Sequence, residues 1–89
     1  MDHINSVRVV NSCDIELRLD LEPWGEQYKM RPRENFTVVA KAPVHGELEI
    51  QIREDRITVF GWSGSVVQVF QDGTEVGGSM QPVPLLPRK

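Results

Sequence analysis

Residues 14–22 read Asp14-Ile15-Glu16-Leu17-Arg18-Leu19-Asp20-Leu21-Glu22, a strict alternation of charged and aliphatic side chains. Successive side chains of a β-strand point to opposite faces, so an extended chain places all the aliphatic residues on one face. An α-helix would scatter the same residues around its circumference. This stretch therefore predicts a strand with one buried face and with its carboxylates directed to water.

The same alternation recurs at residues 47–53, where the pattern predicts that Leu48, Ile50 and Ile52 point inward. Shorter apolar stretches predict further strands, and residues favouring turns separate them. The sharpest turn is Asp72-Gly73, because a tight type I′ hairpin needs positive φ angles. No window shows a helical apolar stripe. The additional strands are predicted at residues 7–10, 26–30 (Tyr28 and Met30 inward), 36–40 (Phe36, Val38 and Ala40 inward), 56–60, 65–71 and 74–76.

Seven to eight short strands predict an all-β domain, an antiparallel two-sheet β-sandwich that resembles immunoglobulin-like folds. A small closed β-barrel is the alternative, because the pattern does not show whether the sheet edges meet. The domain is predicted to cover residues 1–76. Residues 77–89 begin with Gly77-Gly78-Ser79 and continue with three prolines, which predicts a flexible Gly/Pro-rich C-terminal tail.

Composition limits the classes of function. The 89 residues carry 10 Lys and Arg against 13 Asp and Glu, a net charge of −3, which does not favour a nucleic-acid-binding protein. No apolar run approaches the roughly 18–20 residues that a membrane span needs. The single cysteine rules out an internal disulfide, and no export signal is recognisable at the N-terminus. These features predict a cytoplasmic protein.

The residue types that could carry chemistry have simpler explanations. Cys13 has no predicted base beside it. A copper site with His3 and His45 is not predicted, because the Cys, second His and Met of such sites usually cluster in one C-terminal loop and Cys13 is near the N-terminus. The alternating carboxylates predict a solvated face, and the basic run at residues 29–33 predicts a charged hairpin. We therefore predict no catalytic residue, no metal ligand and no cofactor.

Two tryptophans lie beside glycines in predicted turns, Pro23-Trp24-Gly25 and Gly61-Trp62-Ser63-Gly64. Aromatic residues in loops can form a stacking surface for a ligand or a partner side chain, or they can cap the end of a sandwich core. We predict a ligand-binding or partner-binding site at Trp24, Tyr28 and Trp62, with capping as the alternative.

The last residues, Pro84-Leu85-Leu86-Pro87-Arg88-Lys89, match a P-x-x-P-x-[K/R] ligand pattern that occurs frequently by chance. A longer segment, Leu21-Glu22-Pro23-Trp24-Gly25 followed by Tyr28, Pro32, Glu34 and Phe36, resembles a small family of uncharacterised bacterial proteins. Similar sequences often have Gly between the proline and the glutamate, where this chain has Arg33, which leaves the turn type open. The resemblance implies no particular function.

Two hypotheses from different classes follow. The first is a noncatalytic interaction module that binds a protein or a small molecule through the loop aromatics or through a free sheet edge, as a monomer or a homodimer. The second is a small enzyme with an acid and histidine site that the sequence does not reveal. A cleft holding His45 with a carboxylate would favour the enzyme.

Overall fold

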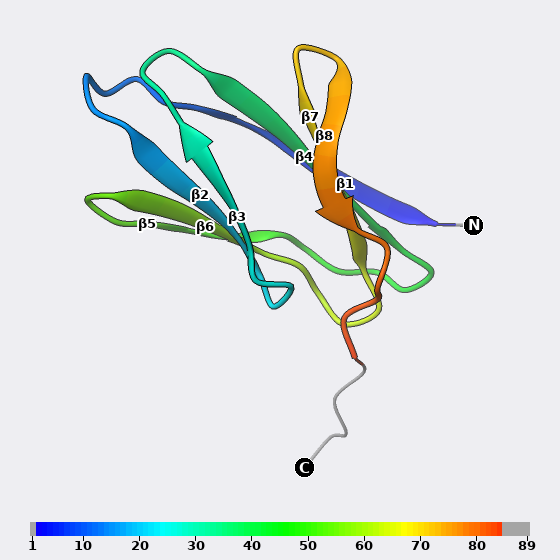
Figure 1. Cartoon of the computed structure of the whole chain (residues 1–89). Helices are drawn as coiled ribbons and strands as arrows, with labels where there is room; N and C mark the ends of the chain where they lie inside the picture. The colour runs from blue at the N-terminus through cyan, green and yellow to red at the C-terminus, as the bar shows by residue number, and fades with distance from the viewer. Residues whose placement is uncertain (1, 85–89) are drawn as a thin grey trace.

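The computed structural model describes residues 2–84, and these residues form eight strands and no helix. This confirms the predicted all-β class (Figure 1). The strands are β1 (His3–Val10), β2 (Leu17–Glu22), β3 (Glu26–Met30), β4 (Asn35–Ala42), β5 (Glu49–Ile52), β6 (Arg56–Phe60), β7 (Val66–Gln71) and β8 (Thr74–Ser79).

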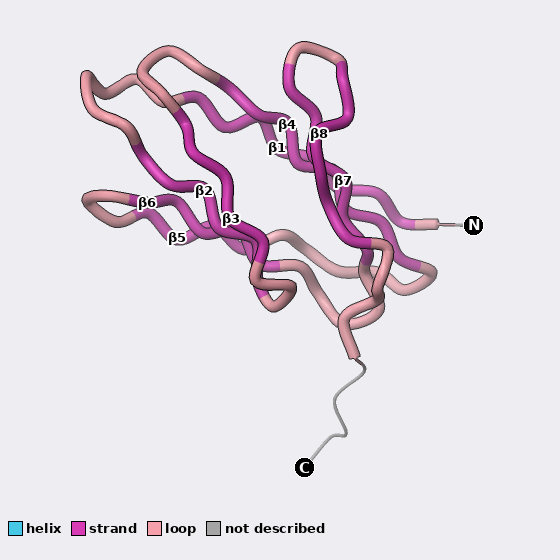
Figure 2. Tube along the Cα trace, in the orientation of Figure 1, coloured by secondary structure: helices cyan, strands magenta, loops and turns pink. Residues whose placement is uncertain are grey.

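The strands form two four-stranded sheets with the orders β1-β4-β7-β8 and β3-β2-β6-β5. The sheets face each other as the predicted sandwich and are not closed into a barrel (Figure 2), so the barrel alternative is wrong. Among the described strands, five pairings are antiparallel, as predicted. The exception is β2, which runs parallel to β6 with Leu19 opposite Ile57.

The path of the chain explains the parallel pair. β1 lies in the first sheet, the β2-β3 hairpin in the second, β4 again in the first, the β5-β6 hairpin in the second, and β7-β8 in the first. The two hairpins of the second sheet therefore meet only after the chain has crossed to the first sheet and back. Parallel neighbours need such a long connection, whereas antiparallel ones can be joined by a tight turn.

The core lies between the sheets and is built from the alternating residues. Leu17, Leu19 and Leu21 of β2 are buried, and β4 buries every second residue from Phe36 to Ala42, which confirms those predictions. Burial of one such Leu or Val contributes about 1.5–3 kcal/mol. The other buried apolar residues of the core are Val9, Met30, Val59, Val67 and Val69.

Residues 14–22 depart from the predicted pattern of exposure at two positions. Ile15 is 61% exposed, because β2 begins only at Leu17 and Ile15 lies in the preceding loop. Asp20, predicted to face water, is only 5% exposed on the outer face of the second sheet. Arg18 donates two hydrogen bonds to its carboxylate, at 2.8 and 3.1 Å, so burial is compensated by a two-point ion pair.

The predicted inward side of residues 47–53 is also wrong in part. Leu48 packs against the core, but Ile50 and Ile52 are 42% and 78% exposed. Both share a face with core residues of β6, because Ile50 lies opposite Val59 and Ile52 opposite Ile57. The alternation therefore identified the correct face of β5, although the outermost strand of this sheet is only partly covered.

The structure moves the predicted end of the domain. β8 continues to Ser79, three residues beyond the predicted boundary at residue 76, and Gln81 and Val83 are hydrogen-bonded to the body of the protein. Residues 77–84 are thus part of the folded structure, which corrects the predicted tail over that range. Residues 85–89, with most of the proline motif, lie outside the described part of the chain.

Candidate functional site

Four connecting segments gather at the end of the sandwich that lies lowest in Figure 1. They are the β2-β3 turn, the β4-β5 loop, the β6-β7 loop and the chain after β8. The β2-β3 turn contains a cis peptide bond between Glu22 and Pro23, followed by Trp24 and by Gly25 with a φ of 79°. Loops at the ends of a sandwich are the usual place for a binding site, because the strands hold the loops in position while the loop sequences are free to vary.

Trp24 joins the turn to two distant segments. Its indole Nε1–H donates a hydrogen bond of 2.9 Å to the carbonyl oxygen of Gln81. The other side of the ring packs against the backbone of Gly61, where an added Cβ would collide with it. The ring is thus held between the β6-β7 loop and the C-terminal segment, and it needs a residue without a side chain at position 61.

The C-terminal segment is fixed by backbone hydrogen bonds to the β6-β7 loop. Gly64 N–H donates to Val83 O at 2.7 Å, and Val83 N–H donates to Ser65 O at 2.9 Å. Gln81 N–H also donates to the Ser79 hydroxyl at 3.2 Å. The prolines at positions 82 and 84 have no N–H group, so the bonds of Val83 provide the anchoring between them.

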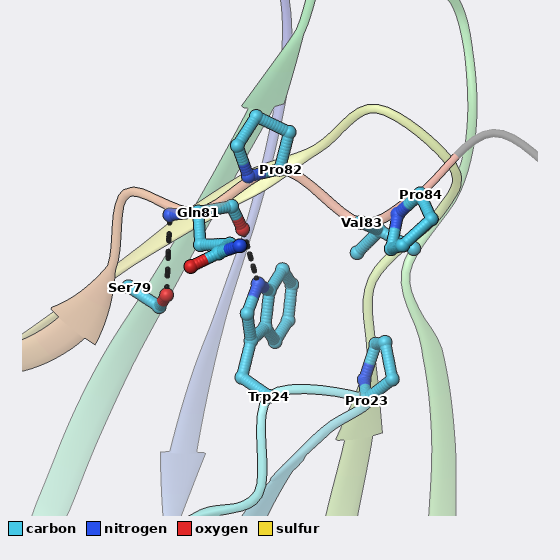
Figure 3. Close-up of a pocket in the computed structure, with 7 residues that line it drawn as sticks. All are labelled: Pro23, Trp24, Ser79, Gln81, Pro82, Val83 and Pro84. Atoms are coloured by element: carbon cyan, nitrogen blue, oxygen red, sulfur yellow. Dashed lines mark hydrogen bonds between the residues drawn. The ribbon is translucent and has the colours of Figure 1, made fainter.

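The β2-β3 turn, the end of β8 and the C-terminal segment line an open pocket of about 420 Å³. Figure 3 shows the Trp24 ring between Pro23 and the Gln81-Pro82 peptide, with Val83 and Pro84 on one side. The described lining contains no ionisable side chain, and its polar side chains are those of Ser79 and Gln81. The lining residues are Pro23, Trp24, Ser79, Gln81, Pro82, Val83 and Pro84.

Trp62 lies at the same end of the molecule but outside this lining. Its Nε1–H donates to Val44 O at 3.0 Å, and its ring lies against Gly46 of the β4-β5 loop. Trp24 therefore contacts Gly61 and the C-terminal segment, whereas Trp62 contacts the β4-β5 loop, and the two rings do not share a contact surface. Each indole N–H already has a backbone acceptor, which is the bonding expected of capping tryptophans.

Tyr28 lies on β3 and packs against the core, with its ring centroid 5.8 Å from that of Phe36. Its hydroxyl donates to Glu26 Oε1 at 3.0 Å and lies against Gly77 of β8. Burial, aided by the carboxylate of Glu26, raises the pKa of Tyr28 to about 12. Tyr28 thus connects the edges of the two sheets and is not part of the pocket lining.

The remaining candidates do not assemble into a reactive site. Cys13 is exposed, and its backbone N–H donates to Asn11 Oδ1 at 2.9 Å. His3 and His45 lie edge to face with ring centroids 5.4 Å apart, and both are exposed. Among residues 2–84, no group of three His, Cys, Asp or Glu side chains is placed to hold a metal ion.

The sequence prediction included Trp24 but missed most of the pocket. Gln81, Pro82 and Val83 were assigned to the tail, and their contribution depends on hydrogen bonds to residues 24, 64 and 65. The available signal was the apolar character of Pro82-Val83-Pro84 directly after the last strand. An apolar segment of that kind gains from packing on an exposed indole ring.

Comparison with known proteins finds no matching family model, no similar curated protein and no similar solved structure. Within the described residues there is also no helix with the length and apolarity to cross a membrane. The function is therefore argued from the geometry of the pocket.

Proposed function

We propose that this protein is a noncatalytic binding module whose pocket at Trp24 receives an uncharged apolar or flat group of a partner, such as a proline ring or an aromatic side chain. One observation carries the proposal. The pocket is lined by an indole ring, three prolines and a valine, with no acid, base or cation among its described lining residues. General acid–base catalysis requires a titratable group within hydrogen-bonding distance of the substrate.

The polar groups of the lining refine the expected ligand. The Trp24 N–H is already used by Gln81 O, so it is not available to a ligand. A bound group is held mainly by packing on the indole and the proline rings, with the Gln81 side chain as the neighbouring polar contact. Such pockets favour apolar groups and discriminate against charged ones, because a buried charge without a partner is unfavourable.

Two broader features bear on the proposed role and on the cellular compartment. Loops at one end of the sandwich would bind the partner, as in immunoglobulin-like domains, and this comparison is one of architecture alone. An exposed free thiol at Cys13 and the likeness of residues 21–36 to bacterial proteins support a reducing bacterial cytoplasm as the compartment.

The proposal is tested by two-dimensional amide NMR of the protein with separate pools of proline-rich peptides, aromatic amino-acid amides, oligosaccharides and nucleotides. We expect the Trp24 indole signal and the backbone amides of Ser79, Gln81 and Val83 to move with the first two pools. Trp62 is an internal control, because its indole has the same kind of hydrogen bond but does not line the pocket.

A variant with a charge at the rim of the pocket distinguishes binding in the pocket from binding elsewhere on the surface. Pro82 is exposed, so Pro82→Glu leaves the core intact and places a carboxylate beside the apolar ligand. We expect at least about tenfold weaker binding, since each factor of ten corresponds to about 1.4 kcal/mol. Unchanged affinity in Pro82→Glu, or shifts confined to the surroundings of His45, would refute the pocket as the binding site.

A further inference from the structure

β5 is the free edge of the second sheet, and it exposes Ile50 and Ile52. β5 pairs with β6 on one side, and no strand of the described chain pairs with its other side. An exposed edge that carries isoleucines is a template for pairing with another strand. The other edge of this sheet, β3, differs because it buries Met30 and packs Tyr28 against the core.

The backbone of β5 identifies which groups are free. Arg53 N–H donates to Arg56 O, so these two residues form a hydrogen-bonded pair next to the β5-β6 turn. Hydrogen-bonded and non-hydrogen-bonded pairs alternate along an antiparallel ladder. Glu49 and Gln51 therefore direct their N–H and C=O groups to β6, whereas Ile50 and Ile52 direct theirs away from the sheet.

We propose that β5 pairs antiparallel with β5 of a second copy of this chain, about a two-fold axis at Ile50. This inference goes beyond the proposed function and uses a different surface, because no residue of β5 lines the pocket. The four-stranded sheet β3-β2-β6-β5 of one copy thereby continues into the same sheet of the second copy. Ile50 lies opposite the second copy's Ile50 as a hydrogen-bonded pair, and Ile52 lies opposite the second copy's Leu48.

The side chains on the outer face favour this register. Glu47 and Arg53 lie three residues on either side of Ile50, so each Glu47 faces the second copy's Arg53. Glu49 in turn faces the second copy's Gln51. Opposite charges directly across a strand pair are stabilising, and like charges are destabilising. On the inner face, the Ile50–Ile50 pair and the two Ile52–Leu48 pairs place branched aliphatic side chains against one another.

Neighbouring registers are less favourable. Centring the axis on Glu49 would place two glutamates face to face. Centring it on Gln51 would pair Glu49 with Arg53 and Ile50 with Ile52, but it would also place Glu47 opposite Asp55 and Leu48 opposite Glu54. A shift by one residue would exchange the two faces and bring isoleucines against charged side chains. Of these registers, the one centred on Ile50 places no like charges and no aliphatic side chain against a charge over residues 47–53.

The test is a charge-reversal cycle read by sedimentation velocity from about 1 µM to about 1 mM, a range that covers moderate and weak dimers. The unchanged protein is expected to dimerise with concentration. Arg53→Glu and Glu47→Arg each place like charges across both ends of the pairing. We expect each variant to dissociate at least about tenfold more readily.

The double variant E47R/R53E restores both opposite-charge pairs and is expected to dimerise as the unchanged protein does. An equimolar mixture of the two single variants is expected to form a heterodimer, since each supplies the charge that the other needs. Glu16→Arg and Arg31→Glu change the net charge equally at exposed positions outside β5 and are the matched controls. All of these side chains are exposed, so folding is preserved.

A protein that stays monomeric at about 1 mM refutes the proposal. A dimer that both single variants retain also refutes it, because the interface would then lie elsewhere. These outcomes leave the ligand-binding test of the pocket unaffected.

Discussion

At the scale of single residues, the most consequential polar side chain is Asn11, which is fully buried. Its Nδ2 donates to Ile15 O at 2.9 Å and to Met30 O at 2.8 Å, while its Oδ1 accepts from Cys13 N–H. One amide group thus fixes the loop between β1 and β2 and attaches it to the end of β3. Both side-chain N–H groups and the carbonyl oxygen of Asn11 have hydrogen-bond partners, which compensates the burial of the amide.

Removal of this amide is expected to lower the free energy of unfolding strongly. Asn11→Ala removes three hydrogen bonds from a buried site, and we expect a loss of about 2–4 kcal/mol. Urea unfolding followed by tryptophan fluorescence measures it. The control is Asn5→Ala, which removes one partly buried bond to Gly46 O and is expected to lose less than about 1.5 kcal/mol. Equal losses would contradict the role given to Asn11.

Tyr28 gives the protein a defined response to alkaline pH. Its pKa is about 12 in the folded protein and 10 in the unfolded chain, so the folded state retains the proton longer. Stability is therefore unaffected by this group below pH 10 and declines as the pH rises from 10 to about 12. The chain has one tyrosine, so phenolate absorbance reports it alone.

We expect Glu26→Gln to shift this absorbance titration to lower pH, because the carboxylate that disfavours the phenolate is lost. The shift is partial, since burial remains the larger cause. A titration in the unchanged protein with a midpoint near pH 10 would show that the hydroxyl is solvated.

At the scale of elements, the turn between β3 and β4 contains a residue in an unfavourable conformation. Arg33 has a φ of 74°, in the left-handed region that favours glycine, and its backbone N–H donates to Asn11 O. The guanidinium also contacts Cys13 O and the Asp14 carboxylate, both at 3.0 Å. Glycine adopts this φ without a steric penalty, whereas arginine does not.

We expect Arg33→Gly to be more stable than Arg33→Ala by about 1 kcal/mol. Both variants lose the exposed side-chain contacts, and only glycine relieves the backbone, so the pair isolates the conformational effect. Thermal and urea unfolding measure the difference. Equal stability of the two would mean that position 33 does not adopt a left-handed conformation in solution.

The strands themselves were the most predictable elements. Alternation in residues 17–21 and 36–42 located two central strands, because both pack one face on the core. The failures at Asp20 and Ile52 have a common cause. Exposure depends on what covers a strand from outside, namely the Arg18 side chain over Asp20 and nothing comparable over Ile52. That information is not contained in the periodicity of one strand.

At the scale of the whole molecule, the pocket could be only half predicted. Trp24 is conspicuous in its turn, but its hydrogen-bond acceptor is 57 residues away. Long-range pairing of this kind is decided by the packing of both sheets, which brings the β2-β3 turn, the β6-β7 loop and the C-terminal segment together. Short-range patterns predict elements better than they predict which loops meet.

The C-terminal segment is expected to stabilise the whole fold. Removal of residues 80–89 leaves the Trp24 N–H and two backbone groups of the β6-β7 loop without their partners, a loss of about 2 kcal/mol. Removal of residues 85–89 alone is the matched control that keeps these bonds. Unfolding in urea and the emission maximum of tryptophan compare the two. Equal stability and equal emission would contradict a structural role for residues 80–84.

The alternation of the chain between the sheets, described above, has a consequence for the rate of folding. β2 cannot meet β6 until the 38 positions from Arg18 to Arg56 have been looped back over a sheet already started, and β4 cannot meet β7 until the 33 positions from Thr37 to Phe70 have been. Closing such loops is entropically unfavourable before any contact forms, so domains of this topology fold in about milliseconds to seconds, slower than helical bundles. On the ribosome, the same order means that β2 waits with an unpaired edge until β6 emerges. During synthesis, the chain is thus exposed to aggregation along β2, whose leucines are later buried in the core.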